Sequence, residues 1–111
     1  MNNTQNIERT IIASVLNSEI EHNLNPHYFT NEFHKKLVNG INRLKELDEG
    51  IDFELLRYKF IKARKWTINE DTELLMIMTH TTPFASQELF DAYYGVLERE
   101  YRYSADRRMA I

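Results

Sequence analysis

The sequence contains no cysteine, and it has only three glycines and two prolines among its 111 residues. Without cysteine the chain has no disulfide, no thiol nucleophile and no cysteine-based zinc site. So few turn-forming residues do not suit a protein of many short strands, and we therefore expect an all-α fold. Three glycines also cannot form a glycine-rich phosphate loop, and neither GxxxxGK[ST] nor GxGxxG occurs.

Long apolar runs and an excess of positive charge are missing as well. No apolar run approaches the roughly 20 residues of a membrane-spanning helix, and the polar start at residues 1–6 has no signal-peptide pattern. We therefore expect a cytoplasmic protein with no membrane partner. The formal net charge of −3 argues against a strong general nucleic-acid binder. A content of 42% hydrophobic and 28% charged residues is typical of one folded domain over residues 1–111.

Apolar residues recur at helical spacing along most of the chain, which predicts a small bundle of five to seven helices. The first helix is expected at about residues 5–17, with Glu8, Arg9, Thr10 and Ser14 among the polar or small neighbours of its apolar side. A long helix capped by Thr30 or Asn31 is expected to end at Gly50, and another runs from an Asp52 cap to about residue 62. Residues 67–70 form a capping box for the next helix. A loop is predicted at 79–83, which divides the chain into a bundle (1–83) and a long last helix (84–111).

Residues that carry catalysis or bind metals do not form a recognisable pattern. The four histidines are His22, His27, His34 and His80, and no pair has the i, i+4 spacing that places two imidazoles on one helix face. His34 is expected to be structural or exposed rather than a ligand. The serines fall in predicted helices or caps, without the sharp turn that presents a nucleophile. The sequence therefore predicts no catalytic residue, cofactor site or metal site.

The segment 57–66 combines five basic residues with three aromatic residues and no acidic one. One interpretation is a contact with single-stranded nucleic acid through Arg64, Lys65 and Trp66, which would combine charge attraction with base stacking. The other is the end of an amphipathic helix, where cations interact favourably with the helix dipole. We favour the second interpretation.

The last predicted helix carries more aromatic residues than one buried stripe requires. Aromatic side chains are enriched at protein–protein contacts, which predicts a partner-binding surface made of Phe90, Tyr93, Tyr94, Leu97 and Tyr101. We expect self-association as a dimer, with Phe90, Tyr94, Leu97 and Tyr101 near the centre of a two-fold contact. The alternative is a wide core stripe whose tyrosine hydroxyls reach water. Residues 103–111 contain no helix stop signal, so an excised domain is expected.

Several short motifs occur in an order that resembles one protein family. They are the opening helix at 6–16, the turn LNPHYF at 24–29 followed by His34, the Gly50-Ile-Asp52 turn, Thr82-Pro83, and the tyrosine-rich helix ending Arg107-Arg108-Met109. This order resembles the N-terminal domain of bacterial DnaB-type replicative DNA helicases, and it spans nearly the whole chain. Two departures are Gln87, where the family often has Asn shortly after Thr-Pro, and the region 62–72, which matches none of its motifs.

The resemblance implies a helical bundle followed by a helical hairpin. Residues 84–111 would form the first arm of this hairpin, and the hairpin would be truncated because its second arm is not part of the sequence. Such a domain associates in a hexameric ring and docks primase. ATP, Mg²⁺ and DNA would be handled only by a separate C-terminal helicase domain. The first alternative is the helicase-binding C-terminal domain of a bacterial primase, although Met1 favours the helicase. The second, from another class, is a small nucleic-acid-binding module that uses residues 57–66.

Overall fold

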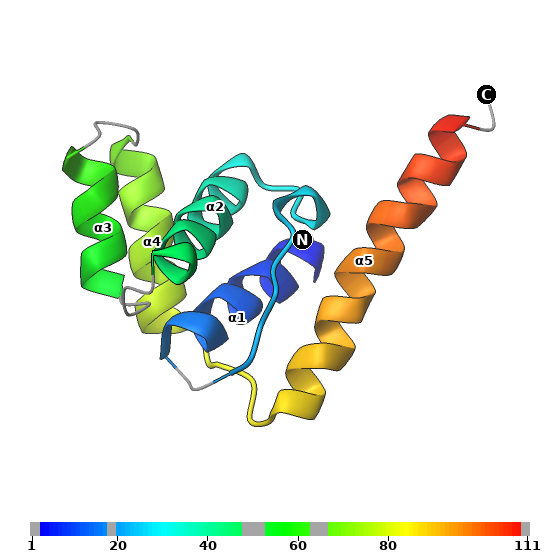
Figure 1. The fold of residues 1–111 in the computed structure, drawn as a ribbon, viewed down its shortest axis with the longest axis horizontal. Helices are drawn as coiled ribbons and strands as arrows, with labels where there is room; N and C mark the ends of the chain where they lie inside the picture. The colour runs from blue at the N-terminus through cyan, green and yellow to red at the C-terminus, as the bar shows by residue number, and fades with distance from the viewer. Residues whose placement is uncertain (1–2, 18–19, 48–52, 63–66, 110–111) are drawn as a thin grey trace.

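The computed structural model describes residues 3–17, 20–47, 53–62 and 67–109, and every regular element in these ranges is helical (Figure 1). The elements are α1 (Asn3–Asn17), the 3-10 helix η1 (Pro26–Tyr28), α2 (Glu32–Glu46), α3 (Phe53–Lys62), α4 (Ile68–His80) and α5 (Gln87–Met109). The expected all-α fold with five to seven helices, the last of them long, is confirmed for the described part of the chain.

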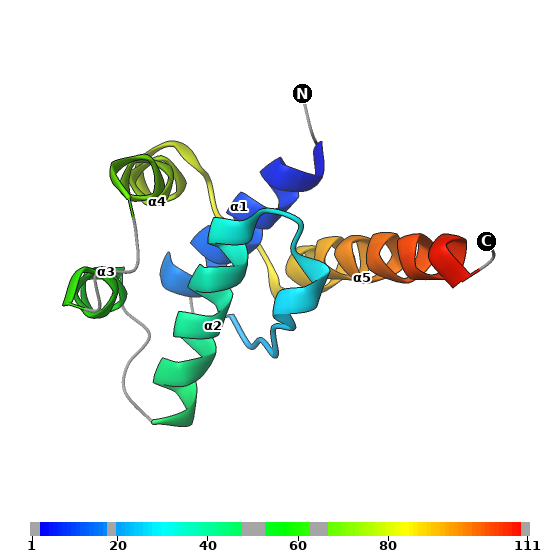
Figure 2. The same ribbon diagram turned by 90° about the horizontal axis from the view of Figure 1, so that it is seen from above.

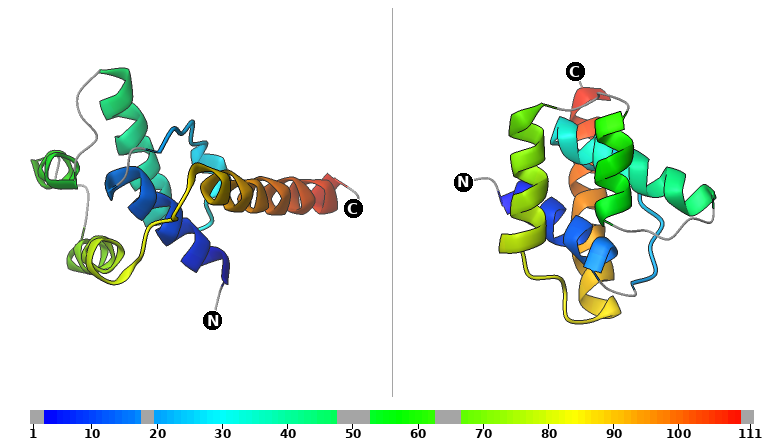
Figure 3. Two further views of the ribbon diagram at one scale, coloured as in Figure 1. Left: turned by 90° about the horizontal axis from the view of Figure 1, so that it is seen from below. Right: turned by 90° about the vertical axis from the view of Figure 1, so that its left-hand side faces the viewer.

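Helix α1 is the central element of the bundle. It packs against α2, α4 and α5, while η1 lies between α2 and α5 and α3 packs on α2. Figures 1 and 3 show α3 and α4 side by side on one flank of α1 and α5 on the opposite flank. Seen from above, the C-terminal part of α5 extends away from the other helices (Figure 2).

Local side-chain caps determine where several helices begin. The Asn31 side chain accepts hydrogen bonds from the backbone N–H groups of Phe33 and His34 at 2.9 and 3.1 Å, so Asn31 rather than Thr30 is the cap of α2. Thr67 and Glu70 form the predicted capping box at the start of α4. The expected Gly50 stop and Asp52 cap lie outside the described residues.

Helix α4 is longer than the sequence predicts, because it continues to His80 instead of ending before a loop at 79–83. Proline excludes the helical conformation mainly for the residue directly before it, which is Thr82 and not Thr79 or His80. The Thr79 hydroxyl donates to the Leu75 carbonyl at 2.7 Å within this last turn. The loop therefore begins at Thr81.

The core combines apolar side chains from all five α-helices and from the segment around η1. Its buried members are Ile11, Ile12, Ala13, Val15, Leu24, Phe29, Phe33, Leu37, Val38, Ile41, Leu44, Leu56, Leu74, Ile77, Phe90 and Leu97. Most of the apolar contribution of α2 lies on one stripe, as its periodicity predicts.

The inner stripe of α5 corrects one of our predictions. Phe90 and Leu97 are buried in the core of their own chain, so they do not lie at the centre of a contact between two copies. Tyr94 is half-buried, and its hydroxyl accepts from the Asn25 N–H at 2.7 Å and donates to the Asn23 carbonyl. The rings of Tyr94 and Tyr101 pack against Tyr28 with centroid separations of 5.7 and 5.3 Å. The segment around η1 thus covers the stripe for which the sequence predicted a second copy.

The cap of α2 gives a first test of the fold. Replacing Asn31 with Ala should lower the free energy of unfolding by about 1 kcal/mol, because two backbone N–H groups lose their acceptor. Urea unfolding followed by circular dichroism measures this change. The control is Asn39→Ala in the exposed middle of the same helix, which should leave stability unchanged or slightly raised because alanine is the better helix former. Equal losses at both positions would contradict the assigned cap.

Candidate functional site

The most concentrated group of charged side chains is buried between three helices. We call Glu8 and Arg9 from α1, His34 from α2 and Glu73 from α4 the buried polar network. His34 Nδ1 lies 2.8 Å from Glu8 Oε1, and His34 Nε2 lies 2.6 Å from Glu73 Oε2. The Arg9 guanidinium donates two hydrogen bonds to Glu73, at 2.8 and 2.9 Å. Glu8 and His34 are completely buried, so the contact between them is shielded from solvent, whereas Arg9 and Glu73 are partly exposed.

The direction of the two His34 hydrogen bonds depends on which ring nitrogens carry a proton. A carboxylate accepts hydrogen bonds and donates none, and both ring nitrogens of His34 face carboxylate oxygens. Both nitrogens can donate only when the ring is an imidazolium. With Glu8 and Glu73 ionised and Arg9 positive, the four formal charges then cancel. A group of buried charges is tolerated when it is paired in this way.

Glu8 also fixes the segment that leads into α2. One of its oxygens accepts from the Thr30 backbone N–H at 2.9 Å and from the Thr30 hydroxyl at 2.7 Å. Burial raises the pKa of Glu8, but the hydrogen bonds from His34 and Thr30 outweigh that effect and lower the pKa below its ordinary value. Burial also raises the pKa of Glu73, and the hydrogen bonds from Arg9 and His34 lower it overall. Both side chains are therefore held as carboxylates.

The histidine of the network is closed to outside chemistry. His34 has both nitrogens occupied and no exposed surface, so it offers no lone pair to a metal and no proton to a substrate. Within the described ranges, no group of three or more histidine and acidic side chains has an arrangement that could hold a metal ion. The network therefore locks α1, α2 and α4 together, which agrees with the structural role predicted for His34.

The buried polar network is not predicted from the sequence, where Glu8 and Ser14 are expected among the polar or small neighbours of the apolar side of the first helix. Both are completely buried. The Ser14 hydroxyl donates to the Thr10 carbonyl and accepts from the Phe84 N–H at 2.8 Å. A signal existed: Glu8 stands three, four and seven residues before Ile11, Ile12 and Val15, so it shares their buried face. A carboxylate in an apolar stripe requires buried donors, and His34 is one.

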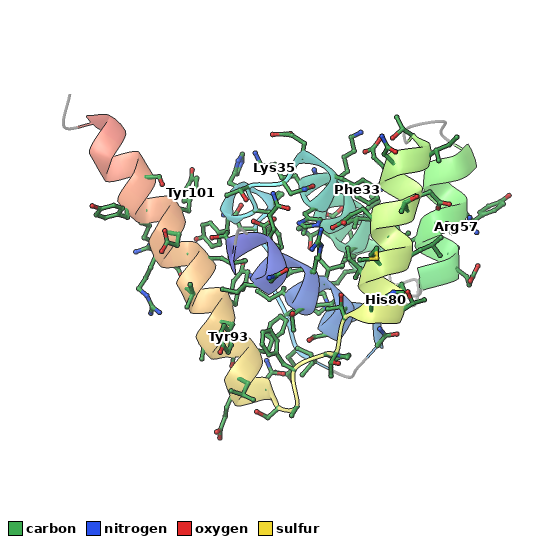
Figure 4. All side chains as sticks on the ribbon, turned by 180° about the vertical axis from the view of Figure 1, so that it is seen from behind. Phe33, Lys35, Arg57, His80, Tyr93 and Tyr101 are labelled. Carbon is green, nitrogen blue, oxygen red and sulfur yellow. The ribbon has the colours of Figure 1, made fainter. Side chains whose placement is uncertain are left out.

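Of the aromatic surface predicted on α5, only part is accessible to a partner, because Phe90 and Leu97 are buried. Tyr93 and Tyr101 remain 41% and 42% exposed, and Leu89 beside them is 45% exposed. The Tyr93 ring stacks on Phe84 with a centroid separation of 4.9 Å, so this surface begins in the loop before the helix. Figure 4 shows Tyr93 and Tyr101 on α5, on the far side of the molecule from Arg57 and His80.

The structure describes residues 57–62 of the basic segment 57–66. The Arg57 guanidinium binds both carboxylate oxygens of Asp71, at 2.9 and 3.0 Å, and this hydrogen bonding lowers the pKa of Asp71. One of the five cations is therefore already paired within the chain, which weighs against a nucleic-acid role. Arg64, Lys65 and Trp66 lie outside the described residues, so the contact proposed for them stays a prediction.

A surface pocket of about 360 Å³ lies between α1 and the C-terminal end of α4. It is lined by Asn6, Arg9, Thr10, Met76, His80, Thr81 and Thr82. Its cation, Arg9, is engaged by Glu73, which leaves little positive charge for an anionic ligand.

Removing Glu8 tests whether the buried polar network holds the fold. Glu8→Ala should lower the free energy of unfolding by about 3–5 kcal/mol, because it leaves His34 and the Thr30 donors without their buried partner. Chemical unfolding measures the loss. Glu100→Ala, on the exposed part of α5, is the matched control and should change stability by less than about 0.5 kcal/mol. A Glu8→Ala variant as stable as this control would refute the structural role of the network.

The lowered pKa values of Glu8 and Glu73 also predict how stability depends on pH. In the unfolded chain both carboxyls return towards the ordinary value of 4.5, so on acidification the unfolded state takes up protons first. The stabilisation is therefore complete above pH 4.5 and is lost as the pH falls through the lower folded-state values. Urea midpoints at a series of pH values should show this decline, and Glu73→Gln should make it shallower. An unchanged slope in Glu73→Gln would contradict the assignment.

Known proteins offer no direct guide to the role of these features. No family model, no curated protein and no solved structure matches the chain. In the part of the chain that the structure describes, no helix is both long enough and apolar enough to cross a membrane. The residues and the fold themselves are thus the basis for a functional proposal.

Proposed function

We propose that the chain is a non-catalytic interaction and oligomerisation domain of a DnaB-type replicative DNA helicase. In the full-length protein, ATP-driven and Mg²⁺-dependent unwinding of duplex DNA would be performed by a separate C-terminal domain. The present domain would join neighbouring subunits in a hexameric ring and dock primase in the cytoplasm. The motif order described above supports this proposal, as does the sequence of structural elements, a bundle followed by a long helix.

The observation that carries the proposal is the form of α5. The first part of this helix packs on α1 and η1, and the rest runs beyond the bundle (Figures 1 and 2). Every residue from Arg99 to Ser104 is exposed, including Tyr103, and the partly exposed ring of Tyr101 also packs against Tyr28. A helix extended into solvent with exposed rings provides a docking surface for another protein segment. This is the form expected for the first arm of a helical hairpin.

We call Leu89, Tyr93 and Tyr101, with Phe84 beneath Tyr93, the outward α5 surface. The chemistry of this surface favours a protein partner. Tyr93, stacked on Phe84 beside Leu89, offers a rigid apolar platform with a polar hydroxyl. Farther along, Glu98 and Arg102 form an ion pair at 2.7 Å, so the charges there are balanced. A surface of this kind lacks the clustered cations that bind a phosphate backbone, and its tyrosines are of the type that dominate binding energy at protein interfaces.

Binding to primase tests the proposal. The purified chain should bind the C-terminal domain of the primase encoded in the same genome, as measured by isothermal titration calorimetry. Tyr93→Ala should weaken this binding by about fivefold or more, because a stacked ring at an interface commonly contributes over 1 kcal/mol. The matched control is Tyr58→Ala on α3, a tyrosine that is 60% exposed, and it should leave the affinity unchanged.

Other outcomes separate the alternatives. Binding to the N-terminal domain of a replicative helicase instead of to primase would reverse the roles and identify the chain as the primase component. Binding to neither protein would remove the proposal. Appreciable ATP hydrolysis by the purified chain would contradict its non-catalytic part.

A further inference from the structure

Helix α4 has an unusual solvent-facing side. We call Ile68, Thr72, Leu75, Met76 and Thr79 the α4 outer face, and these residues follow one another at the helical spacing i, i+4, i+7, i+8 and i+11. Ile68 is 86% exposed, and Leu75 and Met76 are 43% and 42% exposed. The opposite side of the helix already places Leu74 and Ile77 in the core. The α4 outer face is therefore a second apolar stripe that the bundle does not use.

The side of α4 that faces solvent carries no carboxylate, ammonium or guanidinium group. Its remaining exposed residues are Asn69 and His80. The three carboxylates of α4 are instead paired with the bundle: Glu70 with Lys36 at 2.9 Å, Asp71 with Arg57 at 2.9 Å, and Glu73 with Arg9 at 2.8 Å. Solvent-facing helix sides normally carry charge, as the exposed residues of α2 and α5 do here.

The hydroxyls of the two threonines on the α4 outer face donate hydrogen bonds to backbone carbonyls of the same helix. Thr72 donates to the Ile68 carbonyl at 3.0 Å, and Thr79 donates to the Leu75 carbonyl at 2.7 Å. A hydroxyl that donates to its own helix has no proton left for a polar partner, although it can still accept a hydrogen bond. The stripe is therefore apolar at Ile68, Leu75 and Met76 and only weakly polar at the two threonines.

We propose that two copies of this chain associate through α4, with the two helices antiparallel about a two-fold axis. In this arrangement Ile68 lies opposite Thr79 of the second copy, and Leu75 lies opposite Thr72 of the second copy. The four layers formed by Ile68, Thr72, Leu75 and Thr79 then each combine one large side chain with one small one, which lets the helices approach closely. Met76 lies at the edge of this contact, opposite the ion pair of Asp71 and Arg57. A parallel pair would place Ile68 against Ile68 and Thr72 against Thr72, which alternates crowding with gaps.

The helix dipole of α4 also favours the antiparallel arrangement. All its acidic residues lie in its first half, at Glu70, Asp71 and Glu73, while residues 74–80 contain none and end at His80. Because these carboxylates are each paired with a cation of their own chain, the helix dipoles are the larger influence on orientation. Antiparallel packing opposes the two dipoles favourably, whereas parallel packing would align them.

The size of the contact indicates a weak dimer. Four layers on a 13-residue helix provide less than the roughly 800 Å² per partner of a standard stable interface. The contact goes beyond the proposed function, because α4 lies across α1 from α5 (Figures 1 and 3). Pairing through α4 leaves the outward α5 surface accessible to another partner.

Sedimentation velocity over a concentration series tests the pairing with the full 111-residue chain. The unaltered chain should dimerise reversibly, and Leu75→Glu should weaken the dimer by about tenfold or more, because the new carboxylate would be buried without a partner. Leu47→Glu is the matched control, since Leu47 at the end of α2 is 44% exposed, and it should have no effect. Leu89→Glu on α5 tests the alternative surface for self-association. Circular dichroism verifies that all three variants keep their helices.

The possible results are distinguishable. A dimer lost in Leu89→Glu but kept in Leu75→Glu would move self-association to α5, which overturns the α4 contact and leaves the proposed function standing. A chain that stays monomeric at all concentrations would also overturn the contact. Failure of the primase titration alone would count against the proposed function and not against α4 pairing.

Cysteine cross-linking tests the arrangement directly, because the chain has no cysteine of its own. A mixture of Ile68→Cys and Thr79→Cys chains should form a disulfide-linked heterodimer under mild oxidation. Each variant alone should cross-link far more slowly, because equivalent residues would lie about 16 Å apart along the helix axis, too far for a disulfide. Fast cross-linking of either variant with itself, or no preference for the mixture, would overturn the antiparallel pairing.

Discussion

The arrangement of the helices depends on one buried histidine between two carboxylates. The His34 ring lies within hydrogen-bonding distance of Glu8 on one side and of Glu73 on the other, so it joins α1, α2 and α4 at a single point. A shift of any of these helices along its axis would leave a charge buried without its partner, and this costs far more than the loss of a few apolar contacts. Apolar packing drives the association of the helices, while the buried polar network selects one register among many similar ones.

This constraint extends to surfaces that the network does not touch. Because Glu73 is held by His34 and Arg9, the rotation of α4 about its own axis is fixed. This rotation also determines which residues of α4 face α3 and which face solvent. Asp71 is then directed to Arg57 on α3, and the apolar stripe at Ile68 and Leu75 is left facing solvent. An internal ion cluster thus decides which residues this flank of the molecule presents to other proteins.

The sequence predicts local features well, because their causes are local. The Asn31 cap and the Thr67–Glu70 capping box act over two or three residues, and the apolar stripe of α2 needs only its own periodicity. The buried network escaped prediction because Glu8 and His34 are 26 residues apart and Arg9 and Glu73 are 64 apart. On α5, periodicity identified the stripe of Phe90 and Leu97 correctly but could not reveal that α1 and the segment around η1 would pack against this helix.

The central position of α1 has a consequence for how the chain is synthesised. Translation delivers the N-terminal helix first, whereas α4 and α5, which cover it, are completed last. Ile11, Ile12 and Val15 therefore lack their final neighbours until nearly the whole domain has left the ribosome. Closing contacts over such long stretches of chain slows folding relative to a bundle of sequential hairpins. The contacts that bury α1 can therefore be completed only after α4 and α5 have been synthesised.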